Sequence, residues 1–206
     1  MKYPTLAAVA FVLAPVTSAF ADDGLYEDVF DPISSFVRVV APGQTVVSIG
    51  GNKVREIEGG VSLYVNVMPG VIDVALPNGN VEMAVSASTH YTLIMTADGE
   101  TSIITDDIAN NPSKADVSLY NLSATDGVDL YVPAANAVAI DDIASLQSQT
   151  IALRAPLTLD FEVRSGEEIL TSVLQVELER GAGVSIVLVA TDGGYSAVAI
   201  PNSYLK

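Results

Sequence analysis

His90 is the one histidine of this chain and the first candidate for a catalytic or metal-binding residue. It stands at the start of an apolar stretch, and a lone histidine in that setting is far more often structural or surface-exposed than catalytic. A histidine-based metal site normally needs several such ligands. No G-x-S-x-G motif occurs, and no aspartate stands three residues before His90. Serine-nucleophile chemistry is therefore not expected.

The other groups with chemical potential are neighbouring acidic pairs: Asp22-Asp23, Asp106-Asp107, Asp141-Asp142 and Glu167-Glu168. Neighbours in a strand point to opposite faces, so these pairs are not placed to act as an acid and base couple. They also do not follow the D-x-D-x-D-G calcium loop. Arg38, Lys53 and Arg55 form the one basic grouping. We expect them to be isolated, outward-facing residues; the alternative is that strands bring them together to bind an anionic group. We predict no catalytic residue, no cofactor and no metal.

The start of the chain predicts a secretory signal peptide over residues 1–21. It has one basic residue, Lys2, then an apolar run from about 6 to 16, then Ala19-Phe20-Ala21 as a cleavage site. No later segment approaches the roughly 18 apolar residues that a membrane-spanning helix needs. We therefore expect an exported chain that begins at Asp22 and has no membrane span; an uncleaved N-terminal anchor is the alternative.

The composition is acidic and apolar at once. The 206 residues include 25 acidic and 9 basic side chains, for a net charge of −16, with 50% hydrophobic residues and no cysteine. Removal of residues 1–21 takes away one lysine and brings the balance to −17. A field of this sign repels nucleic acid and anionic membranes. The high apolar content indicates a folded protein with an acidic surface rather than disorder.

Apolar residues alternate with polar ones along most of the chain, as in VSLYVNV (61–67) and LTLDFEV (157–163), which is typical of half-buried strands. The residues expected to face inward are Val61, Leu63, Val65 and Val67 in the first stretch, and Leu157, Leu159, Phe161 and Val163 in the second. No window has helical apolar spacing, so helix should be nearly absent. The pattern predicts strands near 36–40, 45–49, 53–57, 61–67, 71–76, 81–85, 91–96, 101–105, 116–120, 128–132, 136–140, 149–154, 157–163, 169–177, 184–190 and 195–200.

The two halves of this pattern repeat each other. Three pairs of positions align with an offset that grows along the chain: Val37 with Val117, Pro69 with Pro156, and Asp98 with Asp192. About eight short strands per copy favour two face-packed sheets. The predicted fold is all-β, with two tandem β-sandwich domains joined by a short linker. The predicted parts are a signal peptide (1–21), an N-terminal segment (22–34), a first β-sandwich domain (35–106), a linker (107–115) and a second β-sandwich domain (116–206).

Several stretches resemble the AlgF family, the periplasmic accessory proteins of bacterial alginate O-acetylation: GLYEDVFDPISSFVRVV, VMPGVIDVAL, HYTLIM, VSLYNLS and LERGAG. The resemblance covers nearly all of the chain after the signal. It implies a periplasmic protein that works beside a membrane-bound O-acyltransferase and serine-type acetyltransferases in transferring acetyl groups to mannuronate hydroxyls. It implies no catalytic residue in this chain.

The acidic charge favours one role within that system. Alginate is a polyanion, so a chain near −17 gains no long-range attraction to it. We expect a non-enzymatic adaptor whose partners are the acetyltransferase proteins, with weak alginate binding left open. Leu25 and Tyr26 are the predicted partner-binding residues, because an apolar pair in an acidic tail suits burial in a partner. The alternative for their segment is packing on its own domain.

Two rival functions are kept beside the adaptor. The first is a carbohydrate-binding module, with Tyr64, Tyr120 or Tyr131 stacking on sugar rings; the absence of tryptophan weakens it. The second is an acetyltransferase in its own right, which the missing nucleophile motif disfavours.

Overall fold

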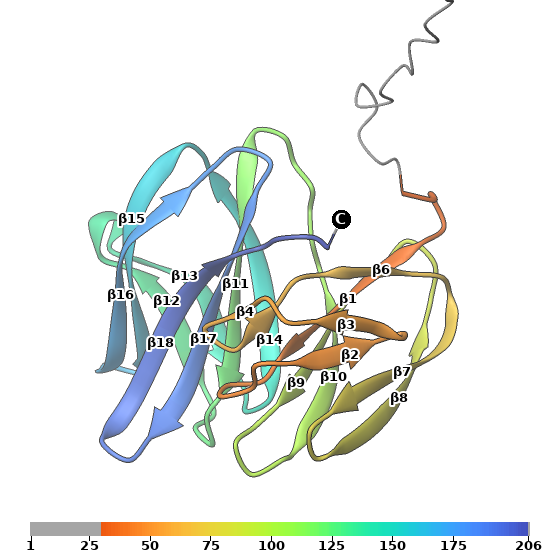
Figure 1. Ribbon diagram of the computed structural model, residues 1–206. Helices are drawn as coiled ribbons and strands as arrows, with labels where there is room; N and C mark the ends of the chain where they lie inside the picture. The colour runs from red at the N-terminus through yellow and green to blue at the C-terminus, as the bar shows by residue number, and fades with distance from the viewer. Residues whose placement is uncertain (1–29, 206) are drawn as a thin grey trace, which may run out of the picture.

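Strands make up nearly all of the regular structure (Figure 1). The computed structural model describes residues 30–205. Within that range the only helical element is the single 3-10 turn η1, Pro133–Ala135. The predicted all-β class is therefore confirmed, and the predicted strands lie within a few residues of the observed ones. The predicted signal peptide lies outside the described residues.

Ten strands form two sheets in the first half of the chain. The sheet that contacts the second half, here called the first inner sheet, has the order β10-β9-β1-β5-β4, with β6 also paired to β1. Its strands are β1 (Ser35–Val40), β4 (Ile57–Glu58), β5 (Val61–Ser62), β6 (Val65–Val67), β9 (His90–Met95) and β10 (Thr101–Asp106). The first outer sheet, in the order β3-β2-β7-β8, consists of β2 (Val47–Ile49), β3 (Asn52–Val54), β7 (Gly70–Leu76) and β8 (Gly79–Val85).

Eight strands form two further sheets in the second half. The second inner sheet, in the order β14-β11-β17-β18, consists of β11 (Lys114–Leu122), β14 (Gln147–Arg154), β17 (Gly183–Thr191) and β18 (Gly194–Pro201). The second outer sheet, in the order β13-β12-β15-β16, consists of β12 (Val128–Val132), β13 (Ala137–Ile143), β15 (Leu157–Ser165) and β16 (Glu168–Leu178).

The topology repeats as the sequence predicts. β1 pairs in parallel with β9, and β11 pairs in parallel with β17, while the next strand, β10 or β18, returns antiparallel. The two outer sheets have matching strand orders. The aligned prolines precede β7 and β15, and the aligned aspartates lie in the β9–β10 and β17–β18 turns. That each half folds by itself within the predicted boundaries stays a prediction.

Each sandwich has its own apolar core, and a third core lies between the halves. Val37 and Val39 of β1 point into the first sandwich, while Val117 and Leu119 of β11 point into the second. The third core draws on both inner sheets: Val40, Val61, Ile94 and Ile104 from the first half, and Tyr120, Leu122, Val187 and Ile200 from the second. The inner sheets are therefore covered on both faces, which explains why β1, β9, β11 and β17 are buried almost throughout.

Three predicted details of the strands are wrong. The strand predicted at 53–57 is divided, because β3 ends at Val54 and β4 begins at Ile57. VSLYVNV is not one strand, because β5 ends at Ser62 and β6 begins at Val65. Between them the Tyr64 N–H donates to the Ser203 carbonyl, and the Tyr64 carbonyl accepts from the Leu205 N–H, each at 2.8 Å. Leu157 was expected to face inward but is 46% exposed, since it is the first residue of β15 and lies beyond the core.

The β4–β5 turn requires glycine, which gives a testable prediction. Gly60 has φ +86°, and a Cβ atom there would lie 2.8 Å from Cα of Pro42. We expect Gly60→Ala to lower the free energy of unfolding by about 1–3 kcal/mol more than Gly43→Ala, because overpacking adds to the backbone strain. Gly43 is the matched control, with φ +79° and no heavy atom within 4 Å of the added Cβ. Urea unfolding measures both, and equal losses would contradict the close packing of this turn.

Candidate functional site

A buried arginine lies at the centre of the contact between the two inner sheets, which we call the joint. Arg38 is only 1% exposed, because the alternation of β1 points it away from the first sandwich and toward the second inner sheet. Its guanidinium makes four hydrogen bonds: Nε to Thr92 Oγ1 (3.0 Å), Nη1 to Asn202 Oδ1 (2.8 Å), and Nη2 to Tyr120 OH (2.7 Å) and Ser185 Oγ (2.8 Å). Three of the four acceptors belong to the second half.

Asp106, at the end of β10, supplies the opposite charge through intermediate hydroxyls. Its Oδ1 accepts from Tyr120 OH (2.5 Å), and its Oδ2 accepts from Thr92 Oγ1 (2.6 Å) and Tyr64 OH (3.0 Å). The Arg38 guanidinium also lies 4.3 Å from the ring centroid of Tyr64 and 5.2 Å from that of Tyr120, within cation–π range. One carboxylate, two phenols and a threonine hydroxyl therefore enclose the cation.

The pKa shifts agree with this arrangement. Burial opposes the charge of Arg38, but Tyr120, Tyr64 and Asp106 favour it, and the net effect raises the pKa of the guanidinium. Burial raises the pKa of both tyrosine hydroxyls above their ordinary value. The phenols therefore stay protonated and donate to Asp106, while Arg38 stays charged.

His90 lies in an aromatic cluster at one end of the joint. Its ring stacks on Phe36 with centroids 4.8 Å apart and meets Tyr64 edge-on at 5.3 Å. Its Nε2 lies 3.2 Å from Tyr204 OH. Burial lowers the pKa of His90; the Asp106 carboxylate opposes this effect, and the Arg38 cation adds to it. The histidine is half-buried and packs against the aromatic side chains of Phe36, Tyr64 and Tyr204.

Residues 202–205, here called the C-terminal strap, cross back from β18 to the first half (Figure 1). Asn202 anchors the strap, because its N–H donates to the Gly183 carbonyl and its Oδ1 accepts from Ser185 as well as Arg38. A Cβ atom on Gly183 would lie 2.3 Å from Asn202 Nδ2, so any larger residue there would displace the side chain that anchors the strap. Tyr204 stacks on Tyr64 with centroids 5.3 Å apart.

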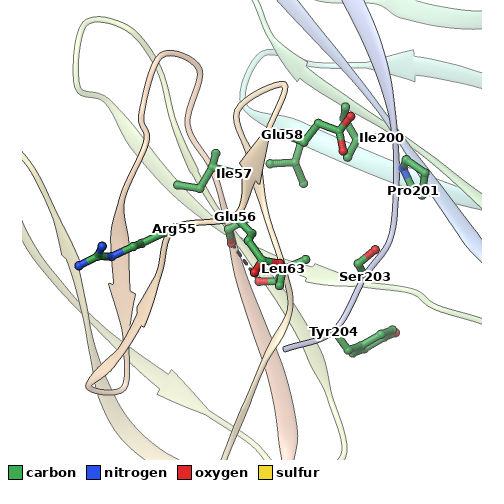
Figure 2. Close-up of a pocket in the computed structure, with 11 residues that line it drawn as sticks. Arg55, Glu56, Ile57, Glu58, Leu63, Ile200, Pro201, Ser203 and Tyr204 are labelled. Atoms are coloured by element: carbon green, nitrogen blue, oxygen red, sulfur yellow. Dashed lines mark hydrogen bonds between the residues drawn. The ribbon is translucent and has the colours of Figure 1, made fainter. Parts of the chain in front are cut away.

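A groove of about 570 Å³ lies between the strap and the β4–β5 hairpin (Figure 2). One side consists of residues 55–58 and 61–63, and the other of Ile200, Pro201, Ser203 and Tyr204. Surface residues from both halves meet around this opening, as they do around a second groove near Pro42 and Leu122. The joint therefore combines a closed polar interior with an open groove at its edge.

The interior of the joint is arranged to hold the halves together. Ser185 is fully buried and hydrogen-bonded to Arg38 and Asn202, and His90 Nε2 contacts Tyr204 OH. Among residues 30–205, no group of three or more His, Cys, Asp or Glu side chains is placed to hold a metal ion. No helix of the described range is long and apolar enough to cross a membrane.

The structure corrects two predictions about exposed residues. Arg38 was expected to face outward and is buried, whereas Lys53 and Arg55 are exposed as expected. Tyr64 and Tyr120 were candidates for sugar stacking, but both are 0% exposed because they pack inside the joint.

The remaining predicted site residues lie away from the joint or outside the described range. Tyr131 is half-buried on β12, and the Arg164 guanidinium covers its ring at 3.4 Å from the centroid. Leu25 and Tyr26 lie outside the described residues. Sequence reasoning missed the joint, although SFVRVV contained its signal, an arginine at an alternate position among valines.

Two tandem β-sandwiches joined through a buried polar network place the chain in the class of double-sandwich all-β proteins. The family model described as Alginate O-acetyl transferase AlgF matches residues 8–185. The chain therefore belongs to the AlgF family, a family of alginate O-acetylation, and the resemblance seen in the sequence is confirmed.

One solved structure found by comparison is that of the C-terminal domain of AlgF from P. aeruginosa. It is 19% identical, the alignment covers 44% of this chain and 99% of that one, and the TM-score is 0.39. No curated protein matches the chain.

Removal of the Arg38 charge should strongly lower the free energy of unfolding. We expect Arg38→Met to lower the free energy of unfolding by about 3–5 kcal/mol, because it leaves Asp106 as a buried carboxylate without its cation. Lys53→Met, at an exposed position, should change it by less than about 0.5 kcal/mol. Urea unfolding checks both. Adding Asp106→Asn to Arg38→Met should recover part of the lost free energy of unfolding, because no buried carboxylate then remains without a cation. If the effects of the two substitutions simply add, Arg38 and Asp106 do not interact as described.

His90 should make stability depend on pH. Its folded-state pKa is below its unfolded value of about 6.5, so the unfolded chain binds more protons as the pH falls. The free energy of unfolding should therefore decrease below about pH 6.5 until the folded-state pKa is reached, at up to about 1.4 kcal/mol per pH unit. His90→Phe should lose this component. Wild type and variant with parallel profiles between pH 7 and 5 would contradict the assignment.

Proposed function

We propose that this chain is a non-catalytic periplasmic adaptor in alginate O-acetylation, bridging the membrane acyltransferase and the periplasmic acetyltransferases. Family membership supports the process, since the matching model covers most of the chain. The predicted signal peptide supports the compartment. The bridging role is supported by the structure of the contact between the two halves.

The observation that supports bridging most is the joint. Arg38 bonds to groups on both halves, and the strap returns from the second half to the first. A protein built this way presents two sandwiches in a defined relative orientation. An adaptor needs that property, because it must hold one partner at a set position relative to another.

The acidic surface supports protein partners over the polysaccharide. Both alginate and this chain are anionic, so their long-range interaction is repulsive, whereas partners with basic surfaces are attracted. Burial of Tyr64 and Tyr120 removes two of the three tyrosines that a carbohydrate-binding module would have used. Titration with mannuronate oligomers distinguishes the two roles, since binding much tighter than millimolar would contradict the adaptor.

The proposed contact of Leu25 and Tyr26 can be tested with the full mature chain. We expect Leu25→Ser with Tyr26→Ser to weaken capture of an acetyltransferase partner at least tenfold, because burial of two apolar side chains contributes about 1.5–3 kcal/mol each. Affinity capture with the purified membrane acyltransferase and periplasmic acetyltransferases measures it.

The matched control replaces two strongly exposed apolar residues elsewhere, Val71→Ser with Leu174→Ser, and should leave capture unchanged. Undiminished capture by the Leu25 and Tyr26 variant would refute the contact. Failure of the wild-type chain to capture any of these partners would refute the adaptor itself.

A further inference from the structure

The groove beside the C-terminal strap presents the edge of a strand. Arg55, Glu56, Ile57 and Glu58 are consecutive, and all four line it. β4 itself consists of Ile57 and Glu58, and Arg55 and Glu56 precede it. Successive side chains of an extended segment point to opposite faces, so four consecutive lining residues place the edge of this segment along the opening. Figure 2 shows these residues along one side and the strap along the other.

That edge is available for pairing. β4 ends its sheet and pairs only with β5 in the part of the chain that the structure describes, through Ile57↔Ser62 and Glu58↔Val61. An unpaired strand edge carries backbone N–H and C=O groups that can add another strand. Nearby, the strap already uses this mode of binding, because its backbone pairs with Tyr64.

The chemistry of the groove selects the kind of strand. Ile57 and Leu63 on the hairpin, which also pack against the first core, and Ile200 and Pro201 opposite supply the apolar part of a lining that is otherwise polar. Glu56 and Glu58 are exposed beside it on a strongly acidic chain, while the Arg55 side chain extends away from the strap (Figure 2). A segment that suits this groove alternates aliphatic side chains, which meet the lining, with basic side chains, which meet the two glutamates.

We propose that the groove is a β-augmentation site that binds an extended partner segment with alternating aliphatic and basic residues, added along β4. The inference rests on the proposed function, because the partner that carries this segment is one of the acetyltransferase proteins. It is separate from the proposed contact at Leu25 and Tyr26. The binding energy comes from backbone pairing and the apolar lining, and the glutamates provide the selectivity.

A peptide titration on the full mature chain tests the site directly. The probe is a seven-residue peptide of alternating lysine and valine, and the comparison peptide has glutamate in place of lysine. We expect saturable binding of the basic peptide and none of the acidic peptide, with NMR amide shifts confined to residues 55–58, 61–63, 200 and 202–204. Two further peptides carry N-methyl groups at every second residue, one at the odd positions and one at the even positions. Only one of these sets removes the N–H groups that face β4, so one of the two peptides should no longer bind. Binding of both methylated peptides would refute the proposed strand pairing.

Two charge-reversal variants separate the groove from the general acidity of the surface. Glu56→Lys with Glu58→Lys should weaken the peptide at least tenfold. Glu167→Lys with Glu168→Lys changes the net charge equally at another exposed pair and should weaken it less than threefold. Equal losses would refute the site, since they would show attraction to the whole surface. Both variants should keep wild-type urea unfolding, because all four side chains are exposed.

Capture of the partners then tests the role of the site. If the wild type captures an acetyltransferase and the Glu56 and Glu58 variant does so at least tenfold more weakly, the proposal holds. If both capture it equally, the groove proposal fails and the adaptor stands. If the wild type captures none, the adaptor fails, and the peptide titration still decides whether the groove binds a strand.

Discussion

The fold depends on one buried cation. Placing a guanidinium away from water is expensive unless hydrogen bonds and an opposite charge compensate it. Arg38 has four hydrogen bonds, two aromatic rings and the Asp106 carboxylate reached through two hydroxyls. Because these groups come from both halves, any change in the relative orientation of the halves would leave charged or polar atoms without partners. Apolar packing alone would tolerate such sliding; the polar network fixes one arrangement.

The joint also explains why the two copies differ where they meet. Alignment of Val37 with Val117 makes Ser118 the counterpart of Arg38 and Tyr120 the counterpart of Val40, and the parallel registers make Ser185 the counterpart of Thr92. A faithful repeat would place two arginines across the same contact, where like charges repel in a poorly solvated space. The first copy supplies the cation, the carboxylate and the hydroxyls of Thr92 and Tyr64, and the second supplies the hydroxyls of Tyr120 and Ser185. The strap adds Asn202 to this set.

The strands could be predicted because alternation and turn residues are local signals, and the observed elements follow them closely. The joint could not be predicted from the sequence. Alternation shows that Arg38 and Tyr120 point out of their own sandwiches, but a single sandwich has solvent there. Only the packing of one half on the other covers that face, and the sequence does not encode this locally. The alternation pattern was therefore right about the direction in which Arg38, Tyr64 and Tyr120 point. The prediction that they face solvent was wrong, because the other half covers them.

The surface of the protein keeps nearly the whole acidic excess. Burial of Arg38 is matched by burial of Asp106 and Asp116, so the remaining acidic side chains still far outnumber the basic ones. On the proposed function, this acidity does more than repel alginate. Alginate competes for any basic surface on an acetyltransferase, and an acidic adaptor offers the same kind of charge together with apolar contacts that the polymer lacks. Charge would favour the encounter, while the apolar groove and strand edge would distinguish the adaptor from the polysaccharide.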